Sequence, residues 1–186
     1  MKLWLHLTLA FCLTTHLISA QNARDWTYSF QNFGLNDGLP STEVYHVMQD
    51  KKKNLWFSTD RGVVKYDGHK FQSYNKSHGL PDLTIFKSYE SEDGKIWFSS
   101  FSHELSYFFN DSIYQYSRNQ ELVSLWKELG YQHIAPHDFF LQGDSIYVGI
   151  QKNRMLIIPP KDSIFEVAVK GRTDDVCYLV LSGNRK

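Results

Sequence analysis

A repeat with a period of 41 residues runs through residues 30–110 and constrains the fold more than any other feature of the sequence. Three pairs of short motifs keep this spacing: Phe30–Phe33 with Phe71–Tyr74, Gly38–Pro40 with Gly79–Pro81, and Leu55–Thr59 with Ile96–Ser100. Chance seldom keeps one offset across separated motifs, so we expect a chain built from copies of one unit of about 40 residues.

Two looser copies follow. The third begins near Ser112–Tyr116 and continues to Ser145–Gly149, so that Tyr147 lies 50 positions after Trp97. The surplus falls around residues 120–132, where apolar residues recur at helical spacing and predict a short inserted helix. A further copy begins near residue 164. The sequence therefore predicts blade-like repeats at about 30–70, 71–112 and 113–163, and the start of another at 164–186.

Each full copy divides into four short strands, expected in the first copy at residues 43–49, 55–58, 63–66 and 70–74. Asp67–Gly68 predicts a two-residue type I′ turn between the last two strands, with Asn110–Asp111 in the corresponding place of the second copy. Asp93–Gly94 predicts a further turn between strands.

Neighbouring aromatic residues such as Trp56 and Phe57 place apolar groups on both faces of a strand, so both faces must be covered. Four-stranded antiparallel units of this length are typical of propeller blades. The sequence predicts an all-β fold, a partial β-propeller of four-stranded antiparallel blades with a short helical insertion in the third repeat. A β-sandwich carrying an accidental duplication is the alternative.

The first 20 residues predict a secretory signal peptide. Lys2 supplies a positive start, Leu3–Ile18 is mostly apolar, and Ser19–Ala20 supplies small residues at the cleavage position. We therefore expect an exported protein with a signal peptide at 1–20 and an incomplete propeller at 21–186.

Lys plus Arg equals Asp plus Glu at 20 each, which disfavours nucleic acid as a partner. The basic run Lys51–Lys53 is interpreted as a solvated turn.

Catalytic motifs are absent from the sequence: there is no Gly-rich phosphate loop, Gly-x-Ser-x-Gly elbow or His-Glu-x-x-His site. His133 and His137 have the spacing of a metal site on a helix, but Pro136 disfavours that helix. We therefore predict no catalytic residue, no metal and no cofactor.

The acidic residues near the turns are predicted to cap backbone amides, and the repeated tryptophans Trp56 and Trp97 are predicted to pack in the core. These acidic residues are Asp50, Asp60, Asp67 and Asp93.

The first copy resembles the two-component regulator propeller repeats found in the extracytoplasmic sensor region of bacterial histidine kinases. The matching motifs are Gly38–Ser41, Val44, Gln49–Asp50, Leu55–Thr59, Gly62–Val63, Lys65–Gly68 and Phe71. The second copy keeps Gly79–Asp82, Asp93–Gly94 and Ile96–Ser99, but has Phe101–Glu104 in place of the small turn before its third strand.

This resemblance implies a ligand-sensing or interaction module on the periplasmic or cell-surface side of a bacterial membrane. It implies oligosaccharides as the ligand class, pairing of propellers in a homodimer, and membrane and kinase regions beyond the C-terminal end of this chain. The chain is then expected to be a fragment that stops before its output domain and is not itself an enzyme. A secreted carbohydrate-active or carbohydrate-binding propeller protein is the alternative.

Ligand contacts are expected from loops at one end of the propeller. The connection after the fourth strand and the connection between the second and third strands emerge at the same end, because meander strands alternate in direction. The residues predicted to bind a ligand are Arg61, His78, Asp82 and His103, with Asp60 and Glu104 on the same loops.

Overall fold

A computed structural model describes residues 30–130, 138–150 and 154–168 of the chain. The chain divides into two units, residues 1–32 and 33–186, and every element below belongs to the second unit. The predicted signal peptide at 1–20, the pair His133 and His137, and the predicted repeat start beyond residue 168 lie outside the described residues.

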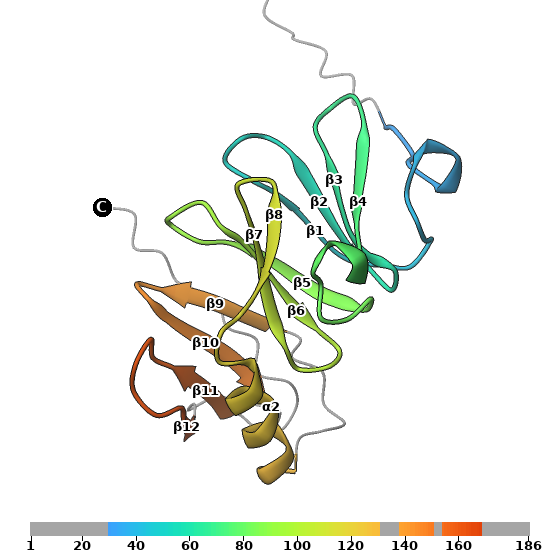
Figure 1. The fold of residues 1–186 in the computed structure, drawn as a ribbon. Coiled ribbons are helices and arrows are strands. Elements are labelled where there is room, and N and C mark those ends of the chain that lie inside the picture. Colours follow the sequence, from blue (N-terminus) through green and yellow to red (C-terminus); the bar gives the residue numbers. More distant parts are fainter. Residues whose placement is uncertain (1–29, 131–137, 151–153, 169–186) are drawn as a thin grey trace, which may run out of the picture. The chain divides into compact units, whose positions relative to one another are not determined.

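Three four-stranded antiparallel sheets follow one another along the chain (Figure 1). The first contains β1 (Val44–Gln49), β2 (Leu55–Thr59), β3 (Gly62–Tyr66) and β4 (Phe71–Tyr74). The second contains β5 (Ile85–Glu90), β6 (Ile96–Ser100), β7 (Leu105–Phe109) and β8 (Ser112–Gln115). The third contains β9 (Asp138–Gln142), β10 (Ser145–Ile150), β11 (Arg154–Ile158) and β12 (Phe165–Ala168).

The strands of every sheet keep their chain order, so each sheet is a meander. The fold is an all-β partial β-propeller of four-stranded blades, as predicted. The fourth strand of a sheet comes from the segment that opens the next sequence repeat: β4 begins at Phe71 and β8 begins at Ser112.

The predicted insertion is the helix α2 (Asn119–Glu128). Leu122 and Trp126 are four residues apart on one face of α2, and each is 1% exposed. They pack in one apolar cluster with Trp97 of the second sheet and Phe139 of the third. Two short 3-10 helices, η1 (Leu35–Asp37) and η2 (Lys76–His78), precede the first and second sheets. None of the described helices is long and apolar enough to cross a lipid bilayer.

Consecutive aromatic residues explain how the sheets pack. Trp56 joins Phe98 and Phe108 in a cluster between the first and second sheets, whereas Phe57 packs on the opposite face with Leu39 and Val64. Because side chains alternate along a strand, two neighbouring aromatic rings supply both faces. Trp56 is 0% exposed and Trp97 is 7% exposed, which confirms their predicted core role.

The expectation that both faces are covered is wrong for β1. Val44, Tyr45 and Val47 are 37%, 43% and 49% exposed. β1 is the first strand of its sheet and, among the described strands, pairs with β2 alone. An edge strand therefore carries apolar side chains that reach solvent.

The two-residue turn predicted at Asp67–Gly68 is also wrong, since the loop between β3 and β4 contains the four residues 67–70. The Asp67 carboxylate accepts hydrogen bonds from the backbone N–H groups of His69 and Lys70, each at 2.9 Å. An aspartate that caps two amides stabilises this wider loop. The two-residue turn predicted at the corresponding place in the second sheet is confirmed, since both residues of Asn110–Asp111 have positive φ and Phe109 pairs with Ser112.

Candidate ligand-binding site

Three connections meet at one end of the first two sheets. The N–H of Gly62, at the start of β3, donates to the carbonyl of Leu83 at 2.6 Å, and the N–H of Phe101 donates to the carbonyl of Thr84 at 2.9 Å. Gly62 has a φ of +109°, and a Cβ there would lie 2.1 Å from the carbonyl oxygen of Tyr74, so only glycine fits. The turn before β3, the segment before β5 and the turn before β7 are therefore neighbours, as predicted.

Arg61 and Asp82 lie at this end. Arg61 is exposed, and its guanidinium forms no hydrogen bond or ion pair with the described part of the chain. The Asp82 carboxylate accepts the N–H of Leu83 at 2.7 Å and lies 3.8 Å from the Lys76 ammonium. Glu104 accepts a hydrogen bond from the Ser102 hydroxyl at 2.8 Å. Arg61 is thus the predicted residue whose charge is most available to a ligand.

The two histidines predicted for the site have other surroundings. The Nδ1 atom of His78 accepts the N–H of Asn75 at 3.2 Å and so caps the short helix η2. His103 is 8% exposed, and its ring centroid lies 4.9 Å from that of Trp126 on α2. The structure therefore brings Arg61 and Asp82 to one end and gives the histidines capping and packing roles.

A row of three aromatic residues, two exposed and one half-buried, occupies the same end. β1 and β5 each contain a β-bulge at the same repeat position, and the extra residues are Tyr45 and Phe86. Their ring centroids are 5.1 Å apart, and Phe86 lies 6.1 Å from Phe101. Tyr45 is 43% exposed and Phe101 is 55% exposed. Tyr45, Phe86 and Phe101 are called the aromatic row below.

Polar groups flank the aromatic row. The hydroxyl of Tyr45 donates to the Glu43 carboxylate at 2.8 Å, and this hydrogen bond raises the pKa of Tyr45. The charge of Asp60 contributes to the same rise in pKa. Exposed aromatic faces beside carboxylates and an unpaired guanidinium can bind a molecule that has both an apolar face and hydrogen-bonding groups.

Sequence reasoning did not identify the aromatic row, although one signal pointed to it: the 41-residue offset aligns Tyr45 with Phe86. In a strand that alternates regularly, Tyr45 and Phe86 would each lie on the opposite face of the sheet from both of their neighbours. The bulges interrupt this alternation and change the direction of the strand locally. No residue type in β1 or β5 predicts a bulge at these positions.

A second group of polar residues occupies one register position in the first strand of each sheet: His46 pairs with Ser58, Lys87 with Ser99, and Asp138 with Gly149. Lys87 and Asp138 form an ion pair that joins the second sheet to the third. Burial lowers the pKa of His46, the charge of Lys87 lowers it further, and Asp138 opposes this shift. Because the charges of Lys87 and Asp138 neutralise each other in this ion pair, we assign the group a role in packing the sheets together.

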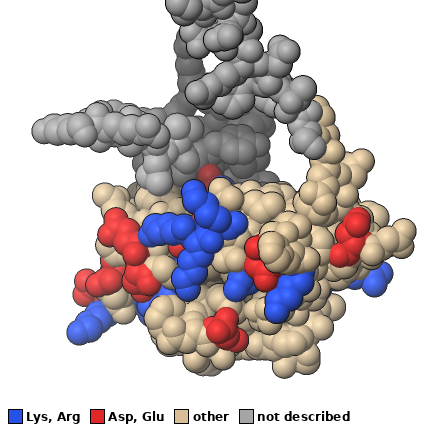
Figure 2. Space-filling view, turned by 90° about the horizontal axis from the view of Figure 1, so that it is seen from above, with Lys and Arg blue, Asp and Glu red and all other residues tan. Residues whose placement is uncertain are grey.

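The charged surface has no dominant sign on the face shown in Figure 2, where groups of basic and acidic side chains lie next to one another. Within the described ranges, no three His, Cys, Asp or Glu side chains are placed to hold a metal ion.

A family model for the two-component regulator propeller matches residues 38–61, from the turn at Gly38 through β1 and β2 to Arg61. The chain carries a two-component regulator propeller repeat. No curated protein matches the sequence.

Solved structures share the fold at low sequence identity. A streptogramin B lyase matches with 18% identity and a TM-score of 0.56, over 78% of this chain and 46% of that one. An extracellular domain assigned to the one-component system BT4673 of B. thetaiotaomicron matches with 15% identity and a TM-score of 0.55, over 83% of this chain and 20% of that one. A second structure, assigned to a hybrid two-component system BT4673, matches with 13% identity and a TM-score of 0.54, over 84% and 20%.

This chain spans less than half the length of each of these structures. The same fold serves a lyase and extracellular domains of regulatory systems, so the fold alone does not decide the function.

Proposed function

We propose that this chain is the ligand-sensing propeller module of an exported two-component sensor, and that its ligand binds at the aromatic row. The regulator-propeller repeat at 38–61 and the fold shared with extracellular domains of regulatory systems support this role. In this proposal the membrane attachment and the output domain belong to protein outside residues 1–186. The chain itself recognises the ligand and does no chemistry on it.

The aromatic row is the observation that carries the proposal. Tyr45 and Phe101 leave about half of their side chains in water, although both lie beside other apolar groups. A row of exposed rings is costly in water and is commonly covered by a binding partner. Arg61, which lacks a partner in the described part of the chain, adds up to five N–H donors at the same end.

An oligosaccharide suits these groups. The apolar face of a sugar ring can lie against the rings of the aromatic row, while its hydroxyls accept from Arg61 and donate to Asp82 or Glu43. Such a ligand does not require a strong net charge at the site, which agrees with the mixture of acidic and basic residues there.

Binding can be tested by calorimetric titration of the full chain with cellotriose, maltotriose and xylotriose. At least one of these sugars should bind, and Phe101→Ala should weaken that binding about tenfold, because a lost aromatic stack costs about 1 kcal/mol or more. Phe165→Ala is the matched control, since Phe165 is 47% exposed on β12 and lies outside the row. Absence of binding, or equal losses in both variants, would contradict the proposed site.

The sensing role has a separate test. We expect the coding sequence that contains these residues to specify a membrane helix followed by a histidine kinase. A gene that encodes no such region would contradict the two-component role even if a sugar binds.

A further inference from the structure

A cleft of about 350 Å³ lies between the first and second sheets. The first sheet contributes Trp56, Lys65 and the turn that follows β1, and the second contributes Phe108 and the tight turn Asn110–Asp111. The cleft shares no lining residue with the aromatic row.

Lys65 is an ammonium without an acidic partner in this cleft. Its Nζ atom lies 5.9 Å from the ring centroid of Trp56 and 5.5 Å from that of Phe108. The side chain is half-buried and forms no ion pair with any residue of the described ranges. Aromatic faces attract one side of an ammonium, but its three N–H donors still favour oxygen acceptors.

Lys95 of the second sheet has similar aromatic neighbours but also an acidic partner. Its Nζ atom also lies near two rings, 5.4 Å from Tyr107 and 5.7 Å from Phe109. Unlike Lys65, it pairs with the Asp93 carboxylate at 2.5 Å. Two lysines in similar aromatic surroundings therefore differ: within the part of the chain that the structure describes, Lys95 has an anionic partner and Lys65 has none.

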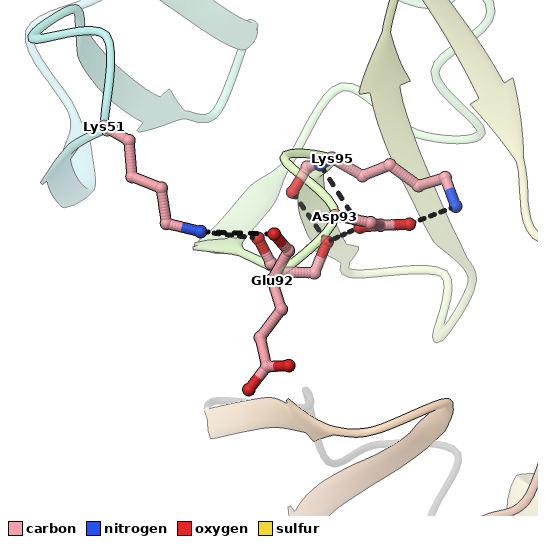
Figure 3. A network of polar contacts seen from close by, with 5 residues as sticks. Lys51, Glu92, Asp93 and Lys95 are labelled. Atoms are coloured by element: carbon pink, nitrogen blue, oxygen red, sulfur yellow. Dashed lines mark hydrogen bonds and ion pairs between the residues drawn. The ribbon is translucent and has the colours of Figure 1, made fainter.

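The basic run Lys51–Lys53 forms part of the cleft. The Lys51 ammonium reaches across to the second sheet and donates to the carbonyls of Ser91 and Glu92 at 3.2 and 3.4 Å (Figure 3). Residues 51–53 form an exposed turn, as predicted, and the Lys51 ammonium additionally joins the two walls of the cleft. Lys52 lines the cleft and is exposed, and its ammonium has no partner in the described residues.

Most of the carboxylates in the cleft are already occupied. Asp50 accepts hydrogen bonds from its own turn, Glu90 accepts the N–H of Lys51 at 2.8 Å, and Asp93 is paired with Lys95. Asp111 on the tight turn remains. Three charged groups of the cleft thus have no hydrogen bond or ion pair within the described residues: the ammonium groups of Lys65 and Lys52 and the carboxylate of Asp111. This set suits a ligand that carries a carboxylate together with hydroxyl groups.

We propose that this cleft binds a small carboxylate-bearing ligand, with the carboxylate on Lys65 and Lys52 and ligand hydroxyls on Asp111. Charge-assisted hydrogen bonds from a partly desolvated ammonium are the stronger kind. The site goes beyond the sensing role and does not depend on binding at the aromatic row.

The test compares D-glucuronate with D-glucose, which differ at C6 by the carboxylate. In the full chain labelled with 15N-tryptophan, the indole N–H signal of Trp56 reports on the cleft and is assigned by its loss in Trp56→Phe. Glucuronate should shift this signal saturably, and glucose at the same concentration should not. Raising the NaCl concentration should weaken the effect, because salt screens a charge pair that is open to solvent.

Lys65→Gln should weaken glucuronate binding at least tenfold, and Lys52→Gln about two- to threefold. Lys127→Gln on α2 is the control, because it removes the same charge away from the cleft. Equal shifts with glucose and glucuronate, no shift with either, or parental affinity in Lys65→Gln would each overturn the proposal. A neutral trisaccharide that binds at the aromatic row without shifting the Trp56 signal would leave the proposed function intact.

Discussion

The first two sheets are copies separated by 41 residues, yet the turns before their buried tryptophans are held in different ways. In the first sheet Asp50, which is 6% exposed, accepts the N–H of Asn54 at 2.8 Å and the indole N–H of Trp56 at 2.9 Å. In the second sheet Ser91 takes this position, and its hydroxyl donates to the Asp93 carboxylate at 2.5 Å. The indole nitrogen of Trp97 is buried and has no hydrogen-bond partner among the described residues.

This difference shows which part of the repeat is essential. Both tryptophan rings are buried, so the apolar contact between sheets is kept. The hydrogen bond to the indole is kept in the first sheet alone. A buried N–H without an acceptor costs about 1–3 kcal/mol. The second sheet tolerates that cost because burial of a large ring contributes more than a single hydrogen bond.

The largest loss of stability is expected when the turn residue Asp50 is replaced by alanine, and the matching change in the second sheet is Ser91→Ala. Asp50→Ala should destabilise the chain by about 3 kcal/mol, because the amide of Asn54 and the indole of Trp56 both lose an ionised acceptor. Ser91→Ala should cost about 1 kcal/mol, since it removes a hydroxyl that bonds only within its turn. Urea unfolding measures both values. Equal losses would show that the two turns contribute alike.

The tryptophans themselves give the next contrast. Trp56→Phe removes both ring volume and a hydrogen bond to a carboxylate, whereas Trp97→Phe removes ring volume and an indole N–H that had no acceptor. The first substitution should therefore cost about 2 kcal/mol more than the second. Thermal and urea unfolding of the two variants provide the comparison. A larger loss for Trp97→Phe would mean that its indole is bonded in solution.

A smaller effect is expected from giving the second sheet the acceptor of the first. Ser91→Asp combined with Asp93→Asn places a carboxylate at the position of Asp50 and removes the carboxylate that accepts from the Ser91 hydroxyl. This double variant should be about 1 kcal/mol more stable than the parent, because the indole of Trp97 gains an acceptor. Asp93→Asn alone is the control in the same unfolding assay. A double variant less stable than this control would show that the turn cannot adopt the first-sheet arrangement.

The smallest effect concerns pH. Burial alone would raise the pKa of Asp50, but hydrogen bonds from Asn54 and Trp56 hold it below its usual value of 3.8. A carboxyl group whose pKa is lowered by folding stabilises the folded state above its unfolded pKa and loses this contribution as pH falls through the folded value. The stability difference between the parent and Asp50→Ala should stay constant from pH 7 to about pH 5 and shrink below about pH 4. A difference that grows in acid would contradict this assignment.

The repeat made most of the fold predictable. The second strand was expected at 55–58 and occupies Leu55–Thr59, and the helix expected around 120–132 occupies Asn119–Glu128. The spacing of apolar residues along the sequence reflects which side chains are buried, so it predicted where these elements lie. The loop at 67–70 was mispredicted because a single aspartate, through hydrogen bonds to two amides, can stabilise a loop longer than the two-residue turn.

The candidate site was less predictable. Strand direction in a meander placed Arg61 and Asp82 at one end, which the structure bears out through the contact of Gly62 with Leu83. The positions of Tyr45 and Phe86 depend on β-bulges, which arise from the pairing of whole strands rather than from a local motif.

The solvent exchange of the two indole N–H groups tests most directly whether the copies differ as described. Both signals can be followed by NMR in the full chain labelled with 15N-tryptophan and assigned with Trp56→Phe and Trp97→Phe. In the parent, the indole proton of Trp56 should exchange with solvent more slowly than that of Trp97. Asp50→Ala should speed up exchange at Trp56, and the Ser91→Asp, Asp93→Asn variant should slow exchange at Trp97. Equal protection of both signals in the parent, unchanged by either substitution, would contradict the account.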